Sequence, residues 1–245
     1  FLNFLDTLCF LKKLDFSLAH QFHKLVLQLF LSKLLRYLSF ILTFESDKTT
    51  KTKIELGDIE YTFDYRTLLL EYTSTGCPGC GSWGKPTFYS LAADNVSTAI
   101  PIAAHIKYGD PMISGVAEAF ARNRTGSKYT PQIWVNAESI MVTNGNSINS
   151  TESVVKAKNL LSSATPTANV GLGGVIKIVD GRAGVKFGVK LNNDVAAGDY
   201  YVNAYLLEDG IVAEQKSYAK NPATHNFVLR QAAHGDWGNK ITKLD

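Results

Sequence analysis

The spacing of apolar positions changes along the chain and divides it into three parts. Between residues 65 and 165, short apolar runs alternate with segments that have the composition of helices. Short apolar runs bounded by turn residues are typical of buried strands. Because strands that alternate with helices form a sheet on which the helices pack, this part predicts an α/β domain with a central mixed sheet flanked by helices.

The predicted order of elements in this part is strand, helix, strand, helix, hairpin, helix. Proline is favoured in a first helical turn, so Pro111 is expected to open the second helix. Asn149 and Glu152 have capping-box spacing ahead of the third helix. The expected strands are 68–73 and 99–105, the hairpin joins 132–135 to 139–143, and the helices are 83–95, 111–124 and 150–161.

Residues 166–245 have no helical period and predict strands. Apolar residues alternate with small or polar ones at Val185, Phe187, Val189 and Leu191. Asp180-Gly181 is a two-residue turn signal, and Asp209-Gly210 predicts a hairpin between residues 201–207 and 211–216. We therefore expect a small antiparallel, all-β, sandwich-like domain to follow the α/β domain.

The first 46 residues differ from the rest because Leu, Phe, Lys and Ser dominate them. Basic residues interrupt the apolar run too often for a membrane-spanning helix, which needs about 20 mostly apolar residues. Residues 33–46 have the order of a short signal peptide, with basic Lys33 and Arg36, an apolar stretch and a polar exit. The alternatives are an amphipathic helix or upstream translation that does not fold. We expect residues 1–46 to make few contacts with the two domains. Residues 47–64 should form a linker and a leading strand.

Composition narrows the classes of function. The chain has 245 residues, of which 45% are hydrophobic and 19% are charged, as in ordinary globular proteins. A net charge of +3 is too small to indicate a nucleic-acid partner. The three cysteines, Cys9, Cys77 and Cys80, are too few for a disulfide-stabilised scaffold, but two of them form a Cys-x-x-Cys pair.

The Cys77-Pro78-Gly79-Cys80 segment lies between the first predicted strand and the first predicted helix. The unpaired N–H groups and the positive dipole end of a helix N-terminus stabilise a thiolate, which is the form that attacks disulfides. Cys77 is the more exposed of the two by position, and we expect it to be the nucleophile. Cys80, one turn further along, would resolve the mixed disulfide.

Three other uses of the cysteine pair stay open. A zinc site needs four ligands, and only His20 and His23, in the first 46 residues, have a suitable further spacing. Two soft thiolates could also bind Cu(I) transiently. A static Cys77–Cys80 disulfide would fit a non-catalytic binding protein. We expect no resident metal and no cofactor.

Two further residues favour redox chemistry. Glu71 lies six residues before Cys77 in an otherwise apolar strand, where burial would raise its pKa and let it exchange a proton with Cys80. The alternative is a strand-end glutamate that faces solvent. Pro131 interrupts the start of an apolar strand, and a cis Thr130–Pro131 bond would turn the chain beside the dithiol. The alternative is an ordinary trans proline.

His105 closes the second predicted strand, at the edge where the dithiol should lie. It could influence a thiolate there because its charge changes near neutral pH. A lone histidine at such a place is more often a surface loop residue, and we expect that here.

These residues resemble the thioredoxin superfamily. The similarity covers residues 65–163 and rests on the strand that contains Glu71, the Cys77–Cys80 motif and the later Thr130-Pro131. It implies that Glu71 is the buried carboxyl group and that Pro131 is cis, with Cys77 and Cys80 as the redox pair. It also implies that Gly76, Pro78, Gly79 and Thr130 contact the substrate.

More narrowly, residues 71–77 and 129–132 resemble exported bacterial thioredoxin-like proteins of unknown function that carry a β-rich C-terminal domain. Residues 225–238 are more loosely similar to that domain in an outer-membrane-associated group. This chain departs from the superfamily at Gly76, where tryptophan is usual, and in its Pro78-Gly79 order. We also expect the β-rich domain to lack a last strand, because it stops early at Asp245.

The resemblance implies an extracytoplasmic protein, periplasmic, outer-membrane-associated or secreted, that exchanges disulfides with disulfide-bonded or dithiol protein partners. The alternative is a non-catalytic secreted or envelope-associated binding protein with a structural Cys77–Cys80 disulfide. Exposure of the Cys77 sulfur would separate the two, because only a catalytic cysteine must be reached by a partner.

Overall fold

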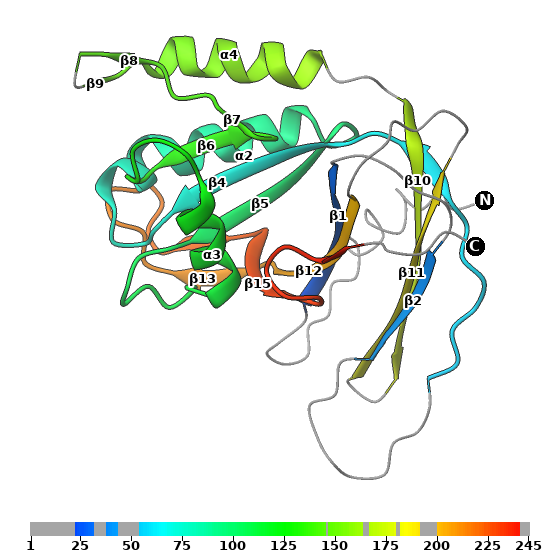
Figure 1. The fold of residues 1–245 in the computed structure, drawn as a ribbon. Helices are drawn as coiled ribbons and strands as arrows, with labels where there is room; N and C mark the ends of the chain where they lie inside the picture. The colour runs from blue at the N-terminus through cyan, green and yellow to red at the C-terminus, as the bar shows by residue number, and fades with distance from the viewer. Residues whose placement is uncertain are drawn as a thin grey trace.

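The computed structural model describes residues 23–31, 38–43, 54–145, 147–163, 167–179, 182–191 and 200–240. Its largest element is an eight-stranded mixed sheet with the strand order β1-β12-β15-β5-β4-β6-β7, in which β16 also pairs with β12 (Figure 1). The strands are β1 (His23–Leu31), β4 (Thr67–Thr73), β5 (Ala99–His105), β6 (Gln132–Val135), β7 (Glu138–Ser139), β12 (Tyr200–Glu208), β15 (Val228–Ala232) and β16 (Asn239–Lys240).

Strand β4 lies at the centre of the α/β part and is buried along its whole length. It runs parallel to β5, from Thr67 opposite Ala99 to Thr73 opposite His105, and antiparallel to β6. Its side chains alternate between the two faces of the sheet, because successive residues of a strand point in opposite directions. Leu70 packs in the core on one face and Leu69 in the core on the other.

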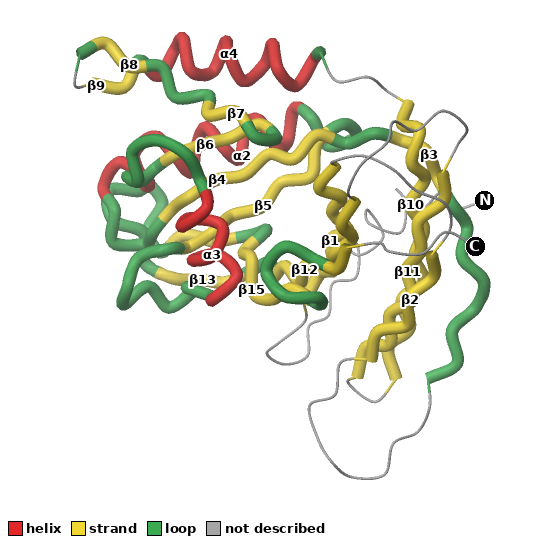
Figure 2. Tube along the Cα trace, viewed as in Figure 1, coloured by secondary structure: helices red, strands yellow, loops and turns green. Residues whose placement is uncertain are grey.

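Helices cover both faces of this sheet (Figure 2). Helices α2 (Lys85–Asp94) and α4 (Ser150–Ser162) bury Leu91 and Leu161 in the same core as Leu69. Helix α3 (Gly115–Asn123) buries Phe120 on the opposite face with Leu70. This part of the chain therefore has the mixed sheet and flanking helices that the apolar pattern predicts.

Local signals predicted most of these elements, with shifts at their ends. Asn149 caps α4 as expected, because its Oδ1 accepts the N–H of Glu152 at 3.1 Å. The hairpin of β6 and β7 forms as expected, but its second strand is only two residues long. Helix α3 begins at Gly115, later than predicted from Pro111, because the Ser114 hydroxyl caps it by accepting the N–H of Ala117.

The C-terminal strands differ from the prediction of a separate all-β domain at residues 166–245. Strands β12 and β15 pair with each other, and β15 also runs parallel to β5, with Val228 opposite Ala103. They extend the central sheet because β5 would otherwise leave an unpaired edge in the α/β part. The predicted hairpin across Asp209-Gly210 does not form either, since β13 (Ile211–Ala213) pairs with β14 (Ala223–His225).

A second sheet of four antiparallel strands has the order β2-β11-β10-β3 and lies beside β1 and β12 in Figure 1. Strands β10 (Thr167–Val179) and β11 (Arg182–Leu191) form the hairpin expected around the Asp180-Gly181 turn, although the turn itself lies outside the described residues. Strand β3 (Thr62–Asp64) supplies the leading strand predicted within residues 47–64. Two two-residue strands, β8 (Thr143–Asn144) and β9 (Ser147–Ile148), pair with each other ahead of α4.

The N-terminal segment contradicts the expectation that residues 1–46 make few contacts. Strand β1 pairs with β12 over nine positions, and β2 (Leu38–Thr43) pairs with β11 over six. Both are runs of mainly apolar residues, which suit strand pairing at the edge of a sheet. The signal-peptide interpretation of residues 33–46 stays a prediction, because only 38–43 of them are described. None of the helices that the structure describes has the length and apolar character needed to span a bilayer.

Candidate functional site

The two cysteines lie where β4 gives way to a helix. Residues 74–77 form a short loop, which we call the dithiol loop, and Cys77 directly precedes the helical residues. Both cysteines are free thiols. The backbone N–H of Cys80 donates to Cys77 Sγ at 3.2 Å, and Cys77 Sγ donates to the carbonyl oxygen of Thr130 at 3.5 Å. Both cysteines are buried, and Cys77, at 5% exposed, is less deeply buried than Cys80, at 0%.

The helix after Cys77 begins with a wide turn, the π-helix η1 (Cys80–Gly84), before it continues as α2. Such single π turns recur at functional sites. A side chain at Gly84 would place its Cβ 2.6 Å from Pro131 Cβ and 2.9 Å from Glu71 Oε1. Only glycine fits this position, and sequence reasoning missed it.

Pro131 lies beside the dithiol, as predicted. The Thr130–Pro131 bond is cis, which confirms the expectation for this proline. Its ring packs against Gly79 and Gly84, with its Cδ 3.2 Å from the place that a Cβ on Gly79 would take. Among the residues expected to contact a substrate, the Thr130 carbonyl oxygen lies 3.5 Å from Cys77 Sγ. Gly76 and Pro78 are exposed, and Gly79 and Thr130 are half-buried.

Glu71 is buried on the side of the sheet that carries α2, so the alternative of a solvent-facing glutamate is wrong. Its Oε1 accepts no hydrogen bond from the residues described. Burial raises the pKa of Glu71 from 4.5 to about 8, although the Lys85 cation and the Thr73 hydroxyl partly oppose this. Burial also raises the pKa of the Cys80 thiol, and the nearby Cys77 and Glu71 add to the rise.

Lys85 is a buried cation that sequence reasoning missed. Its Nζ donates to the carbonyl oxygen of Thr224 at 2.7 Å and lies 4.0 Å from the centre of the Tyr89 ring. Burial lowers the pKa of Lys85 from 10.5 to about 8, against the attraction of Glu71. A carboxyl group and an amine that both titrate near pH 8 therefore lie in the interior behind Cys80.

A second part of the chain completes the site. Residues 214–222 join β13 to β14, and we call them the strap. The Nε2 of the buried Gln215 lies within hydrogen-bond distance of three carbonyl oxygens of the dithiol loop, which share its two N–H groups: Ser74 at 3.1 Å, Thr75 at 3.2 Å and Cys77 at 3.3 Å. The N–H of Lys216 adds a bond to the Thr75 oxygen at 2.8 Å. Sequence reasoning missed Gln215, because nothing local links it to the cysteines.

His105 and Asp110 support the dithiol loop from another side. The two side chains approach within 2.9 Å, and the Asp110 carboxylate accepts the N–H groups of Thr75 and Met112. Burial would raise the pKa of Asp110, but the His105 ring and these N–H groups outweigh it and hold the pKa well below its usual range. His105 is buried, so its interpretation as a surface loop residue is wrong.

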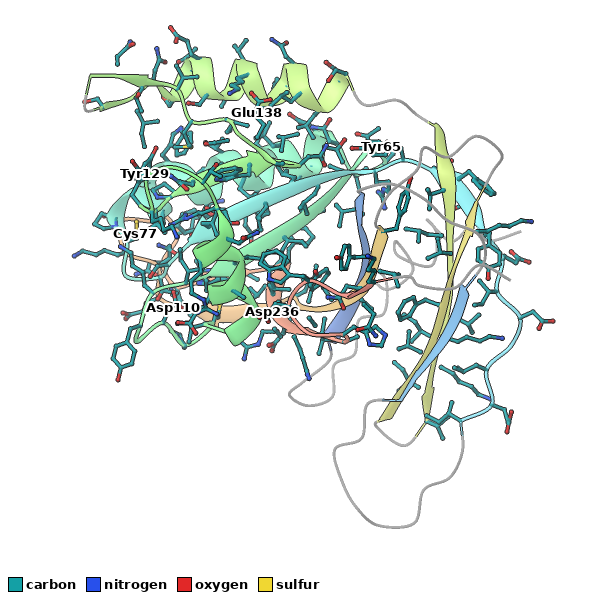
Figure 3. The ribbon with its side chains drawn as sticks, in the orientation of Figure 1. Tyr65, Cys77, Asp110, Tyr129, Glu138 and Asp236 are labelled. Atoms are coloured by element: carbon teal, nitrogen blue, oxygen red, sulfur yellow. The ribbon has the colours of Figure 1, made fainter. Side chains whose placement is uncertain are left out.

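Figure 3 places Cys77 and Asp110 at the same end of the molecule as Tyr129, away from the four-stranded sheet. The arrangement combines an outer thiol, an inner thiol, and a buried acid and base behind them. Across the described ranges, no group of three or more histidine, cysteine or acidic side chains is arranged to hold a metal ion. Comparison with known protein families, with curated proteins and with solved structures finds no match to this chain.

Proposed function

We propose that this protein exchanges disulfides with protein partners through Cys77 and Cys80, and that residues 65–163 form a thioredoxin-like domain. The observation that carries the proposal is the asymmetry of the pair. Cys77, at 5% exposed, is the less deeply buried of the two and its Sγ accepts the N–H of Cys80, whereas Cys80 is fully buried with a raised pKa. A nucleophile must be reachable, and a resolving thiol must be held in reserve until the mixed disulfide forms.

The exchange runs in two balanced steps. The Cys77 thiolate attacks one sulfur of the partner's disulfide, forms a mixed disulfide and releases the other partner sulfur as a thiolate. Cys80 then gives its proton to Glu71, whose carboxylate form becomes available as pH approaches its pKa of about 8, and attacks Cys77 Sγ, which releases the second partner thiolate. The products are a Cys77–Cys80 disulfide and a reduced partner, so two electrons pass from the dithiol to the partner, and the reverse sequence oxidises a dithiol partner.

Two features support the thioredoxin-like part of the proposal. The strand order β5-β4-β6-β7 puts the strand before the cysteines between a parallel and an antiparallel neighbour. The cis Thr130–Pro131 bond lies beside the dithiol, as the resemblance implies. An extracytoplasmic location belongs to the same proposal and rests on the resemblance and on the signal-like order of residues 33–46.

Single cysteine variants test the order of attack. We expect Cys77→Ser to abolish exchange with a disulfide-bonded protein substrate, because the remaining thiol, Cys80, is completely buried. Cys80→Ser should still attack but should accumulate the mixed disulfide, since nothing else can release the partner. Non-reducing gels of the reaction measure both outcomes. A Cys80→Ser variant as active as the wild type would reverse the assignment, and a wild type inactive with a demonstrably free Cys77 would refute the enzyme.

A second candidate is a non-catalytic binding protein in which Cys77 and Cys80 form a static disulfide. The low exposure of Cys77, at 5%, favours it, because a structural cysteine does not need to be reached. The equilibrium of the pair in glutathione buffers separates the candidates. Structural disulfides resist reduction by glutathione, whereas an exchanging pair is reduced and reoxidised within the range of those buffers.

A further inference from the structure

We infer that Gln215 is a positioning residue for the dithiol: its side-chain amide fixes the backbone of the dithiol loop and thereby sets the reactivity of Cys77. The inference rests on the proposed exchange chemistry, which it extends to the C-terminal part of the chain. Gln215 is 1% exposed, and its Nε2 lies within hydrogen-bond distance of the carbonyl oxygens of Ser74, Thr75 and Cys77.

The three carbonyl groups do not need Gln215 to be satisfied. The Ser74 oxygen also accepts the N–H of Cys77, and the Cys77 oxygen also accepts the N–H of Gly81. The Thr75 oxygen also accepts the N–H of Lys216. Because each oxygen keeps a partner without Gln215, removing the amide should leave the fold intact and free only the position of the loop.

The strap is itself firmly held, so it provides a fixed reference for the loop. Asn221 Oδ1 accepts the backbone N–H of Gln215 at 2.8 Å. Strands β13 and β14 pair at both ends of the strap, and Lys85 Nζ donates to the carbonyl oxygen of Thr224 next to it. The strap also lies directly against the helix, since a Cβ on Gly81 would fall 2.0 Å from the Lys216 oxygen.

The link to reactivity is the hydrogen bond from the Cys80 N–H to Cys77 Sγ, 3.2 Å long. This bond stabilises the thiolate more than the thiol, because hydrogen bonds to charged acceptors are the stronger ones. A dithiol loop released from Gln215 can move the sulfur away from that N–H. Weakening one hydrogen bond to a charged group changes an equilibrium by about tenfold or more.

The charged groups around the dithiol that the structure describes are not hydrogen-bonded to the Gln215 side chain, although Asp110 also accepts the N–H of Thr75 in the dithiol loop. Glu71 and Lys85 lie on the helix side, and the Asp110–His105 pair lies beyond Thr75. None of them is bonded to the Gln215 side chain among the contacts of the described residues, so a change in the pH profile of Cys77 reports the loop and not a new charge.

The test is the rate at which iodoacetamide alkylates Cys77 in the reduced full-length protein, measured from pH 5 to pH 10. We expect Gln215→Met, which fills the same space without a donor, to react about tenfold more slowly than the wild type near neutral pH. The two rates should approach each other at the alkaline end of this range, where the hydrogen bond from the Cys80 N–H matters less for forming the reactive thiolate. A loss of structure would instead raise the rate at every pH by exposing the sulfur. Gln231→Met, the same change at an exposed glutamine of β15, is the matched control and should follow the wild type.

An unchanged pH profile in a folded Gln215→Met variant would overturn the inference. If that variant does not fold, Asn221→Ala is the second test, because it removes the side-chain oxygen that accepts the Gln215 N–H. Asn221→Ala should slow the alkylation of Cys77 in the same pH range. A wild-type pH profile in Asn221→Ala would overturn the inference. Alkylation needs no partner protein, so the outcome is independent of the exchange assay. A shifted profile in a protein without exchange activity would support the positioning role and refute the proposed function.

Discussion

Glu71 and Lys85 bring an acid and a base into one buried space with overlapping titration ranges. Burial raises the pKa of the carboxyl group and lowers the pKa of the amine, each to about 8. The cause is the same for both, since the interior disfavours the charged form of either group. Below pH 8 both groups mainly hold their protons, and near pH 8 each can give up or take a proton. That property suits the proposed exchange, in which Cys80 has to lose a proton.

Replacing Glu71 should change how stability depends on pH. Its folded-state pKa of about 8 lies above the unfolded value of 4.5, so the folded protein holds a proton that the unfolded chain loses between these values. Wild-type stability should therefore fall as pH rises from about 4.5 to 8, and Glu71→Gln should remove that fall. We expect the variant to gain up to a few kcal/mol relative to the wild type between pH 5 and pH 8, because one pKa unit corresponds to about 1.4 kcal/mol.

Urea unfolding of the reduced proteins at several pH values below 8 measures this difference. The range stops there because Lys85, with its lowered pKa, adds stability as pH rises from about 8 towards 10.5. Glu214→Gln, at an exposed carboxyl group, is the control and should keep the wild-type slope. Equal slopes in Glu71→Gln and the wild type would contradict a buried, protonated Glu71.

The rate of disulfide exchange by Glu71→Gln should also be lower than that of the wild type, by about 10² to 10⁴, the usual contribution of general acid–base catalysis.

Among single residues, local spacing in the sequence predicted those of the site that are close in sequence to the cysteines. Glu71 and the cysteines share one strand–helix connection, and Pro131 could be recognised because proline at the start of an apolar strand is unusual. Gln215 could not be predicted, because its contact with Cys77 spans 138 residues and an isolated glutamine carries no pattern. Gly84 was equally hidden, since its role depends on two side chains that only the fold brings against it.

Among the elements, the strap and the wide turn η1 depend on each other. Gly81 has no side chain, and this allows the Lys216 carbonyl to lie against the helix. The turn at Asp209-Gly210 explains why this strap exists in place of the expected hairpin. Asp209 Oδ1 accepts the N–H of Phe227, and the N–H of Gly210 donates to Asn226, so the turn is tied to the start of β15 and not to a returning strand. Turn residues alone could not predict which strand would follow.

A methyl group at Gly81 should separate the strap from the helix. We expect Gly81→Ala to lower the free energy of unfolding by about 1–3 kcal/mol, the usual cost of overpacking, because its Cβ would meet the backbone oxygen of Lys216 at 2.0 Å. This would outweigh the gain of about 0.5–1 kcal/mol that alanine normally brings to a helix. Gly76→Ala is the matched control, since nothing lies within 4 Å of its Cβ. Urea denaturation compares the two, and equal stabilities would mean that the strap does not dock.

Across the whole molecule, the sheet joins parts of the chain that the sequence pattern assigned to separate units. Strand β15 follows β5 in the sheet, although more than a hundred residues separate them, and Ser114 at the start of α3 donates to the carbonyl oxygen of Leu229 at 2.7 Å. The pattern of β12 and β15 predicted strands correctly. It could not predict their partners, because an alternating strand has the same sequence whether it joins one sheet or another.

Removal of the N-terminal strands tests this organisation. We expect a chain that starts at Ser46 to melt at least about 4 °C below the full chain, the shift that corresponds to roughly 1 kcal/mol or more in a protein of this size. The reason is that β12 and β11 would lose the pairings with β1 and β2. A chain that starts at Gln21 keeps both strands and serves as the control. Equal melting temperatures for the full chain and the chain from Ser46 would show that these pairings contribute nothing to stability.

The distance along the chain between Gln215 and Cys77 also matters during protein synthesis. A ribosome adds about 5–20 residues per second, so the 138 residues between them take roughly 7–28 s to make. Throughout that interval the nascent chain carries Cys77 on a dithiol loop that the Gln215 amide does not yet hold. The cysteines therefore meet cellular oxidants and other thiols before the chain can close over them, and the finished reactivity of Cys77 arises only late in translation.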